Sequence, residues 1–254
     1  MNLADITPLI LTFNEAPNID RSLAALSWAS EVVVVDSNST DATRDILARY
    51  PEVRVVARTF AGHAAQWNVA LRETGVTTPW VLALDADYRL SEALVAEIRD
   101  VQPPEDISGF RVPFVYLVDG KLLRGSLYPP SIVLFRRERG EYVQDGHTQR
   151  LRLVGRIAEL RNPIYHDDRK SFDHWRNAQR KYMRLEARKL RSTPLAQLSW
   201  PDRARRFLLG PVLVVPYCLF GKGLVLDGSA GLKYTGQRFY TELLLAGVLV
   251  RGAD

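Results

Sequence analysis

The first 100 residues alternate short apolar runs with helical patterns, and this alternation constrains the fold more than any other feature of the chain. Four runs have the length of strands: residues 8–12, 31–36, 54–57 and 80–84. The run Val32-Val33-Val34-Val35 is continuous and β-branched, as in strands covered on both faces. Helical patterns follow at residues 18–26, 42–50 and 63–73, and Ser91 is placed to cap another helix. Strands and helices at this spacing predict an α/β fold with a parallel sheet between two layers of helices.

Acidic residues stand where three of the predicted strands end. Asn14-Glu15 follows the first strand, Asp36 ends the second, and Asp85-Ala86-Asp87 follows the fourth. Ligands of open parallel sheets bind beyond the carboxyl ends of the strands, so we expect these side chains to meet in one crevice. Carboxylates at such short distances repel one another unless a cation or hydrogen-bond donors lie between them. Mg²⁺ or Mn²⁺ carrying a diphosphate fits this chemistry, because both ions prefer oxygen ligands.

The triplet Asp85-Ala86-Asp87 places its two carboxylates on opposite sides of an extended chain. One of them can accept a hydrogen bond from a ribose hydroxyl while the other reaches a metal ion. An Asp-x-Asp triplet by itself often does no more than end a strand. Its place after an apolar strand, with Asp36 ending an earlier one, favours the metal-binding interpretation.

Three motifs of other α/β enzymes are missing from the sequence. There is no Gly-x-Gly-x-x-Gly after the first strand, which argues against a dinucleotide dehydrogenase. A Gly-rich loop ending in Lys-Ser/Thr is also missing, which argues against a nucleotide triphosphatase. The absence of Gly-x-Ser-x-Gly excludes the hydrolase elbow.

After residue 105 the pattern changes from strand–helix alternation to hairpins. Residues 110–118 and 121–124 flank Asp119-Gly120, a strong signal for a two-residue turn. We expect a further strand at residues 131–135 and a second hairpin, residues 150–153 with 156–160, around Val154-Gly155. The second half of the sheet is therefore predicted to be mixed.

The C-terminal third is basic and apolar. A long helix rich in Arg and Lys is expected over residues 171–191. Residues 207–226 are the most apolar segment, but glycine, proline and Lys222 interrupt it, so we interpret it as a re-entrant or interfacial helix pair, with a spanning helix as the alternative. The last apolar stretch, 243–250, is too short to span a bilayer. We therefore divide the chain into a catalytic domain, residues 1–170, and a membrane-associating region, residues 171–254.

Charge is divided unevenly along the chain. Residues 1–146 hold 14 Lys/Arg against 20 Asp/Glu, a net −6, whereas residues 147–254 hold 20 against 9, a net +11. Basic residues beside apolar surface favour an anionic membrane face over nucleic acid, although a solvated basic helix without a partner gives the same pattern. The single cysteine, Cys218, excludes a disulfide within the chain and favours a reducing compartment. No basic segment precedes a long apolar stretch at the N-terminus, so a secretory signal peptide is not expected.

Several blocks of sequence, taken together, resemble glycosyltransferase family 2. They are Leu11-Thr12-Phe13-Asn14-Glu15, Val34-Val35-Asp36-Ser37-Asn38-Ser39-Thr40-Asp41 and Leu84-Asp85-Ala86-Asp87. Within that family, three further blocks are similar to bacterial lipopolysaccharide-core and envelope-polysaccharide enzymes: residues 60–68, Leu134-Phe135-Arg136-Arg137 and Asn162-Pro163-Ile164-Tyr165-His166. The resemblance covers about residues 5–190.

The resemblance implies a GT-A fold, a Rossmann-like mixed sheet flanked by helices, and transfer with inversion at the anomeric carbon. It implies that Glu15 and Asp36 hold the nucleoside, that Asp85 faces the ribose or diphosphate, and that Asp87 binds the metal. The remaining predicted nucleotide-sugar contacts are Asn14, Asp41, His63, Gln66 and Arg136, and His166 is a second metal candidate. Structural roles stay open for these residues: helix caps for Glu15 and Asp36, a helix surface for His63 and Gln66, a solvated strand end for Arg136 and a structural histidine for His166.

An inverting transfer also needs a base on the acceptor hydroxyl. Many relatives carry a His-Glu pair in the segment that here reads Asp145-Gly146-His147-Thr148-Gln149. Thr148 stands at the glutamate position, so this chain departs from the family pattern. Asp145 is our first candidate for the base, and His147 is the second.

These features predict a glycosyltransferase that moves a sugar from a nucleotide donor, UDP-linked in our interpretation, to a lipid-linked saccharide of the cell envelope. It would work at the cytoplasmic face of the inner membrane, with peripheral or re-entrant attachment. A polyprenyl phosphate is the alternative acceptor. A non-catalytic nucleotide-sugar-binding scaffold is the alternative of another class, kept open by Thr148. The apolar C-terminal segments could also bury against a second copy of the chain.

Overall fold

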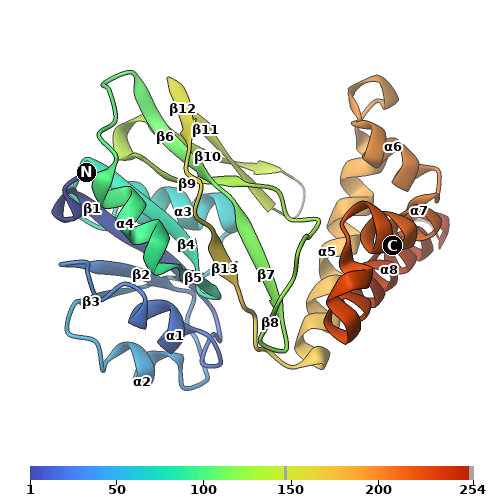
Figure 1. Cartoon of the computed structure of the whole chain (residues 1–254), viewed down its shortest axis with the longest axis horizontal. Helices are drawn as coiled ribbons and strands as arrows, with labels where there is room; N and C mark the ends of the chain where they lie inside the picture. Colours follow the sequence, from blue (N-terminus) through green and yellow to red (C-terminus); the bar gives the residue numbers. More distant parts are fainter. Residues whose placement is uncertain (146–147, 252–254) are drawn as a thin grey trace. The chain divides into compact units, whose positions relative to one another are not determined.

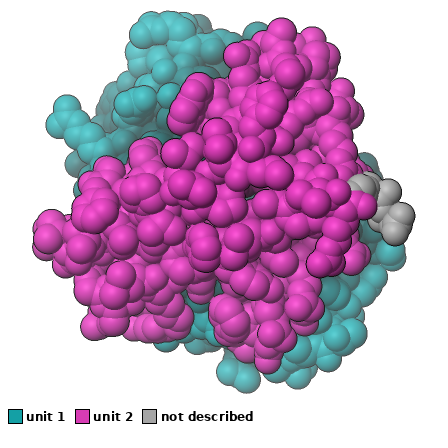
Figure 2. All heavy atoms as spheres, turned by 90° about the vertical axis from the view of Figure 1, so that its right-hand side faces the viewer, with its two compact units in different colours: residues 1–115, 128–169 teal, residues 116–127, 170–254 magenta. Residues whose placement is uncertain are grey.

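A computed structural model describes residues 1–145 and 148–251, and the chain forms two compact units. Unit 1 contains residues 1–115 and 128–169, and unit 2 contains residues 116–127 and 170–254 (Figure 2). Unit 1 carries the sheet and unit 2 carries the C-terminal helices (Figure 1).

The centre of unit 1 is a seven-stranded mixed sheet in the order β12-β6-β9-β4-β1-β2-β3. Its strands are β1 (Ile6–Thr12), β2 (Val32–Asp36), β3 (Val53–Ala57), β4 (Trp80–Asp85), β6 (Ile107–Val112), β9 (Ser131–Arg136) and β12 (Arg156–Glu159). Strands β4, β1, β2 and β3 are mutually parallel, whereas β9 runs antiparallel to both β4 and β6. The predicted α/β fold, parallel in its first half and mixed in its second, is confirmed.

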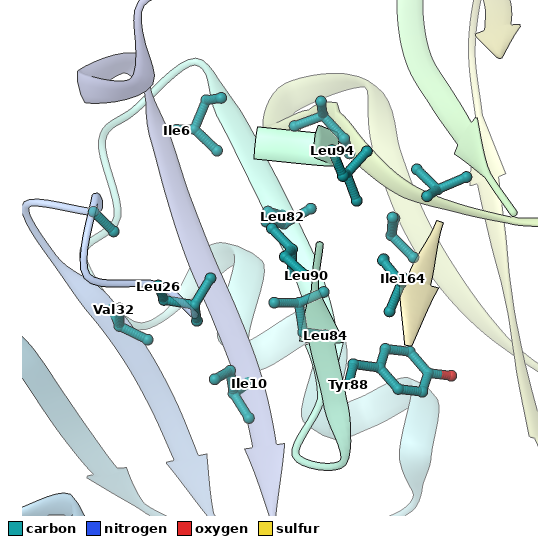
Figure 3. Close-up of a cluster of buried hydrophobic side chains, with 14 of the residues drawn as sticks. Ile6, Ile10, Leu26, Val32, Leu82, Leu84, Tyr88, Leu90, Leu94 and Ile164 are labelled. Atoms are coloured by element: carbon teal, nitrogen blue, oxygen red, sulfur yellow. The ribbon is translucent and has the colours of Figure 1, made fainter. Parts of the chain in front are cut away.

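The valine run of β2 shows why this sheet lies between two apolar layers. Val32 and Val34 belong to one buried cluster, and Val33 and Val35 belong to another. Successive side chains of a strand point to opposite faces, so a continuous apolar run supplies both cores at once. Figure 3 shows the first cluster, in which side chains of β1, β2 and β4 meet those of α4 (Glu92–Asp100) and β13 (Ile164–His166).

Short elements complete unit 1. Its helices are α1 (Ile19–Ala24), α2 (Thr43–Leu47), α3 (His63–Arg72) and α4 (Glu92–Asp100), with 3-10 turns η1 (Leu3–Asp5) and η2 (Arg137–Arg139). Its other strands are β5 (Tyr88–Leu90) with β13 (Ile164–His166), and β10 (Gly140–Asp145) with β11 (Thr148–Leu153), each pair antiparallel. As predicted, Ser91 caps α4, because its hydroxyl accepts a hydrogen bond from the backbone N–H of Leu94 at 3.1 Å.

The predicted hairpin around Val154-Gly155 is wrong. Strand β11 pairs with β10 instead, and β12 leaves to pair in parallel with β6. Val154 would be the first central residue of such a turn, where both favoured types require a positive φ that a β-branched residue strongly disfavours. Gly155 has another role: at φ +118° it lies so close to Ser108 that a Cβ would stand 2.0 Å from the serine oxygen.

The predicted hairpin around Asp119-Gly120 is confirmed. Strands β7 (Phe114–Val118) and β8 (Lys121–Leu122) pair antiparallel, and Asp119 and Gly120 have φ of 51° and 77°. The tip of this hairpin belongs to unit 2, because Val118 and Leu123 pack in one buried cluster with Cys218 and Tyr234. Lys233 holds the turn from the other side through an ion pair with Asp119 at 2.6 Å.

Unit 2 is otherwise helical. Its elements are α5 (Phe172–Ser192), α6 (Trp200–Arg206), α7 (Gly210–Pro216) and α8 (Gly228–Arg251), with the short turns η3 (Leu195–Gln197), η4 (Tyr217–Gly221) and η5 (Leu224–Asp227). A second buried cluster joins Met183, Ala187 and Leu190 of α5 to Leu198 and to Leu245 of α8.

None of the helices in the described part of the chain is both long and apolar enough to cross a bilayer by itself. One pair of helical segments, Gly210–Gly221 and Leu224–Arg251, meets the length and composition criteria together, but the pair is bent by 72°.

Candidate functional site

The register of the sheet brings the predicted acidic residues to one edge. Thr12 of β1 lies beside Asp36 of β2, and Leu11 lies beside Asp85 of β4. Strands in a sheet are about 4.8 Å apart, so the backbones of Asp36 and Asp85 are separated by about 10 Å across β1. The loops that follow β1, β2 and β4 therefore leave the sheet from the same carboxyl edge.

Asn14 and Asp41 join the loops after β1 and β2. Asn14 has φ of 55°, a left-handed conformation that asparagine tolerates, and its Oδ1 accepts from the backbone N–H of Thr40 at 2.8 Å. Asp41 Oδ2 accepts from the backbone N–H of Ala16 at 3.2 Å. Burial raises the pKa of Asp41, but hydrogen bonds from Thr43 and Ala16 outweigh it and lower the pKa overall. Both predicted contact residues thus shape the loops at this edge.

Asp36 lies at the centre of this arrangement and is fully buried. Its carboxylate accepts from the backbone N–H of Ser39 at 3.0 Å and from Arg44 Nε at 2.7 Å, and it also accepts from the hydroxyls of Thr12 and Ser39. Burial alone would raise the pKa of Asp36, but the hydrogen bonds from Ser39 and Arg44 hold it below the ordinary value. With this many internal donors, Asp36 positions the loop that follows β2.

Asn18, which the sequence analysis did not select, holds Glu15 in place. Its amide Nδ2 donates to Glu15 Oε2 and to Asp168 Oδ1, both at 2.9 Å. Its Oδ1 accepts from Arg21 at 2.9 Å and from the backbone N–H of Arg169 at 2.8 Å. The side chain is 1% exposed. Asn18 therefore ties the loop after β1 to the segment that follows His166.

Asp87 and His166, the two predicted metal ligands, lie next to each other. His166 Nε2 is 3.5 Å from Asp87 Oδ2, and the two side chains are 13% and 14% exposed. The pairing of β13 with β5, which sets His166 opposite Tyr88, holds the histidine at this position. The aromatic rings of Tyr88 and Tyr128 lie 5.4 Å and 5.6 Å from the imidazole ring, centre to centre.

The negative charge of Asp85 acts on three phenols, those of Tyr88, Tyr128 and Tyr142. The hydroxyls of Tyr88 and Tyr128 are hydrogen-bonded to each other. Burial raises the pKa of Tyr88 and Tyr128 well above their ordinary value, and the negative charge of Asp85 raises both further. Tyr142 shows the same shift from the same two causes. These phenols therefore stay protonated at neutral pH, as hydrogen-bond donors beside a carboxylate.

The side chains at this edge fit a divalent cation whose remaining ligands are water and the phosphates of a bound substrate. Within residues 1–145 and 148–251 no group of three or more His, Cys, Asp or Glu could hold a metal ion. Asp87 and His166 supply a carboxylate oxygen and an imidazole nitrogen at the same place. Mg²⁺ commonly takes one or two protein carboxylates and completes its shell with water and substrate phosphates. This pair fits that kind of site.

Gln66 and His63 lie at the start of α3. Gln66 is 1% exposed and donates through Nε2 to Ser37 Oγ at 3.0 Å, so it is not a residue of the helix surface. Its Oε1 is buried and has no hydrogen-bond partner among the residues that the structure describes. His63 is half-buried with its ring edge-on to Phe60. Trp67 is buried in the core and stacks on Tyr142.

Asp145 reaches the same edge along β10. This strand runs beside α3: Asn68 bonds both backbone groups of Tyr142, and Gln144 Oε1 lies 3.5 Å from the backbone nitrogen of Ala64. The strand thus ends near the N-terminus of α3, and Asp145 Oδ2 pairs there with Arg150 at 2.7 Å. His147, the second candidate for the base, lies outside the described residues.

Arg136 is not brought to this edge. It lies opposite Trp80, the first residue of β4, because β9 runs antiparallel to β4. Its Nε donates to the carbonyl of Ile107, and its guanidinium stacks on the Trp80 ring. Five residues of strand, about 16 Å, separate this position from Asp85. We therefore leave Arg136 out of the proposed donor site.

A mixed sheet of this topology, with acidic groups at the ends of its parallel strands, defines a GT-A nucleotide-diphospho-sugar transferase fold. The crystal structure of glucosyl-3-phosphoglycerate synthase from Mycobacterium tuberculosis with phosphoglyceric acid has a similar fold, with a TM-score of 0.50 and 16% identity over 73% of this chain and 79% of that one. Residues 9–147 match the family described as Glycosyl transferase family 2. This match covers more than half of the chain, and the protein therefore belongs to that family.

Two relatives of known assignment are similar in sequence. The lipopolysaccharide core biosynthesis glycosyltransferase LpsC of Rhizobium meliloti is 30% identical over 54% of this chain and 53% of its own length. An N-acetylglucosaminyl-diphospho-decaprenol L-rhamnosyltransferase of Mycobacterium tuberculosis is 24% identical over 52% of this chain and 48% of its own length. An uncharacterized glycosyltransferase of Rickettsia bellii is 40% identical, but over only 31% of its length. The chain thus spans about half or less of these relatives.

Proposed function

We propose that this protein transfers a sugar from a nucleotide-diphosphate donor, a UDP-sugar, to a lipid-linked saccharide, with inversion at the anomeric carbon. The observation that carries the proposal is the adjacency of Asp87 and His166 at the carboxyl edge of the sheet, beside Asp85 and its phenols. A site of acidic, imidazole and phenolic groups suits a cation-bound diphosphate next to a ribose.

In this proposal different residues bind different parts of the nucleotide-sugar donor. Asp85 accepts from a ribose hydroxyl, and Asp87 and His166 hold a Mg²⁺ or Mn²⁺ ion. When bound, the ion supplies positive charge that stabilises the departing diphosphate. Tyr88 and Tyr128 remain neutral and offer hydroxyls to donor oxygens, while Asn14, Asp36 and Asp41 keep the loops around the nucleoside in one conformation.

Asp145 is the proposed base. An inverting displacement removes a proton from the acceptor hydroxyl on the face of the sugar opposite the leaving group. Asp145 ends β10 beside the N-terminus of α3, and Arg150 of the neighbouring strand donates to its Oδ2. The proton passes from the acceptor oxygen to Asp145 as that oxygen forms the new glycosidic bond.

The relatives support a lipid-linked acceptor. LpsC acts in lipopolysaccharide core biosynthesis, and the mycobacterial relative is named for a diphospho-decaprenol substrate. Both names refer to a saccharide attached to a lipid, which supports a lipid-linked acceptor for this chain. That the chain works at the cytoplasmic face of the inner membrane is part of the same proposal. A polyprenyl phosphate itself is the second candidate acceptor, because the mycobacterial name includes such a carrier.

Calorimetric titration with UDP, with and without Mn²⁺, tests the donor site. We expect Mn²⁺-dependent binding by the wild type and its loss in Asp87→Asn, which keeps the size of the side chain but removes the charge. Asp45→Asn is the matched control, because Asp45 is exposed on α2 and no hydrogen bond or ion pair of its side chain occurs within the described chain. This variant is expected to bind UDP like the wild type.

Each other outcome has a definite meaning. Equal binding by the wild type and Asp87→Asn would place the cation elsewhere, and no binding by either protein would refute a UDP donor. Mn²⁺-dependent binding without release of UDP from any UDP-sugar and lipid-linked acceptor would favour a nucleotide-sugar-binding scaffold over an enzyme.

A further inference from the structure

Three consecutive apolar side chains are exposed at the junction of α6 and α7 in unit 2. Phe207, Leu208 and Leu209 are 62%, 40% and 50% exposed, and Val212, one turn further, is 71% exposed. Figure 1 shows this junction between the two labelled helices. Single exposed apolar residues are ordinary on a soluble protein, whereas runs of three are avoided unless they have a function.

The backbone at this junction is strained, because a leucine occupies a position with a left-handed conformation. Leu208 has φ of 63°, a left-handed conformation that costs a leucine about 1 kcal/mol and a glycine almost nothing. The N–H groups of Leu208 and Leu209 donate to the carbonyls of Arg205 and Ala204 at 3.0 and 2.9 Å, which is the ordinary end of a helix with glycine at this position. A leucine here raises the energy of the fold and adds exposed apolar surface, so folding alone does not explain it.

The apolar surface continues along the chain that follows. Tyr217, Phe220, Val225 and Leu226 are all exposed, so the segment 207–226 shows solvent an aromatic or large aliphatic side chain in every one of its turns. The opposite side of the same segment is committed to unit 2, because Val214, Cys218 and Leu224 are buried in its core. The segment is therefore amphipathic, with an inner face that is already satisfied.

Unit 2 also has a large positive charge. It holds 17 Lys/Arg against 7 Asp/Glu, a net +10. Four of the basic residues, Arg180, Lys181, Arg184 and Arg188, are exposed on α5 within about 100° of the helix circumference. No ion pair of these four side chains occurs in the described parts of the chain. Like charges at this spacing destabilise a helix, and an anionic partner removes that cost.

We propose that unit 2 docks on an anionic bilayer, with Phe207, Leu208, Leu209 and Val212 inserted among the lipid headgroups and the α5 basic face attracted to their phosphates. Charge complementarity selects this occupant over unit 2 of a second copy, since two such units of charge +10 repel each other. Attachment is interfacial, because α8 turns buried Tyr234, Thr241 and Glu242 toward the interior of unit 2. Docking would bring the donor site to a lipid-linked acceptor, and only this benefit rests on the proposed function.

Flotation of the full chain with vesicles tests this proposal. Phosphatidylcholine vesicles with one quarter phosphatidylglycerol are compared with pure phosphatidylcholine at 0.1 M NaCl. We expect binding to the anionic vesicles, a loss of about tenfold in Leu208→Gly, and a loss on the order of 100-fold when Arg180, Arg184 and Arg188 are changed together to Gln. Val154→Ser, at an exposed apolar residue of unit 1, is the control and is expected to bind like the wild type.

Leu208→Gly separates docking from folding. Glycine relieves the left-handed strain, so this variant is expected to melt at the same temperature as the wild type or higher while binding vesicles less. Mn²⁺-dependent UDP binding is expected to be unchanged, which keeps this test independent of the donor site. Undiminished vesicle binding by Leu208→Gly would overturn the proposal. So would a dimer in light scattering that Leu208→Gly dissociates, together with no vesicle binding by the wild type.

Discussion

Two buried carboxylates, Asp36 in unit 1 and Glu242 in unit 2, differ in the number of donors that surround them. Asp36 receives hydrogen bonds from Ser39, Arg44 and Thr12, and its pKa is lowered despite complete burial. Glu242 has Arg205 at 2.9 Å, but burial raises its pKa, and the attraction of Arg205 offsets this only in part. Arg205 also contacts Glu186 at 3.3 Å and Asp202 at 3.8 Å, so its charge is shared among several acids. Burial raises the pKa of both carboxylates, and only at Asp36 do the surrounding donors outweigh it.

The polar groups of the two units differ in a similar way. At the carboxyl edge of the sheet in unit 1, polar loops are fastened to one another by side-chain hydrogen bonds, as at Asn14 and Asn18. Unit 2 leaves Arg180, Arg184 and Arg188 of α5 without an ion pair among the described residues and exposes the outer face of the segment 207–226. A preorganised polar edge suits a small charged ligand, whereas loose positive charge beside apolar surface suits an extended partner.

Replacing the proposed base, Asp145, should give the largest loss of activity. It tests whether the residues that carry out the reaction lie in unit 1. Asp145→Asn is expected to lower kcat by about 10²–10⁴-fold, the usual contribution of a general base, with UDP binding unchanged. The rate of UDP release from the UDP-sugar at saturating donor and acceptor measures kcat. Asp173→Asn, at an exposed carboxylate of α5 in unit 2, should leave kcat unchanged. A loss of less than tenfold in Asp145→Asn would assign the base to another residue.

The second prediction concerns stability and compares one asparagine in each unit. Asn18→Asp removes two donors and puts a carboxylate against Glu15 and Asp168, so the free energy of unfolding should fall by about 3 kcal/mol. Asn177→Asp changes an exposed residue on α5 in the same way and should alter stability by no more than about 0.5 kcal/mol. Urea unfolding at pH 7 measures both. Equal changes in the two variants would contradict the role of Asn18 as the centre of that network.

The sequence predicts the parts of this molecule that depend on local pattern. The valine run of β2, the Asp119-Gly120 turn and the Ser91 cap each have a period or a residue type that one conformation requires, and all three are confirmed. Acidic residues at the ends of parallel strands were correctly expected to share an edge, because parallel strands end on the same side. The adjacency of Asp87 and His166 followed from family resemblance, since 79 residues separate them in the chain.

Other features depend on pairing between distant strands, which local pattern does not encode. Arg136 lies at the opposite edge of the sheet because β9 is antiparallel to β4, and the sequence predicted β9 without its direction. Strand β12 pairs with β6 although a glycine next to β11 suggested a hairpin. The network of Asn18 joins residues about 150 positions apart. The Leu208 strain was invisible too, because a leucine gives no sign of a left-handed backbone.

The smallest predicted effect concerns pH and applies to the two buried carboxylates. The pKa of Glu242 is raised in the folded protein above its ordinary value of 4.5, so the folded state binds more protons than the unfolded state above that pH. Stability from this group is therefore present at low pH and is lost as pH rises from 4.5 through the folded pKa. Glu242→Gln removes the titration, and we expect the variant to gain stability relative to the wild type as pH rises above 4.5.

Asp36 supplies the internal control for this experiment. Its pKa is lowered from 3.8, so the stability that it contributes is present above pH 3.8 and is lost as pH falls through the folded pKa. This acid limb should be the same in the wild type and in Glu242→Gln, because Asp36 is unchanged. Calorimetric melting across the pH range measures both limbs. Curves that stay parallel above pH 4.5 would mean that Arg205 and Arg238 fully compensate the burial of Glu242, and the contrast between the two units would then rest on exposed surface rather than on buried charge.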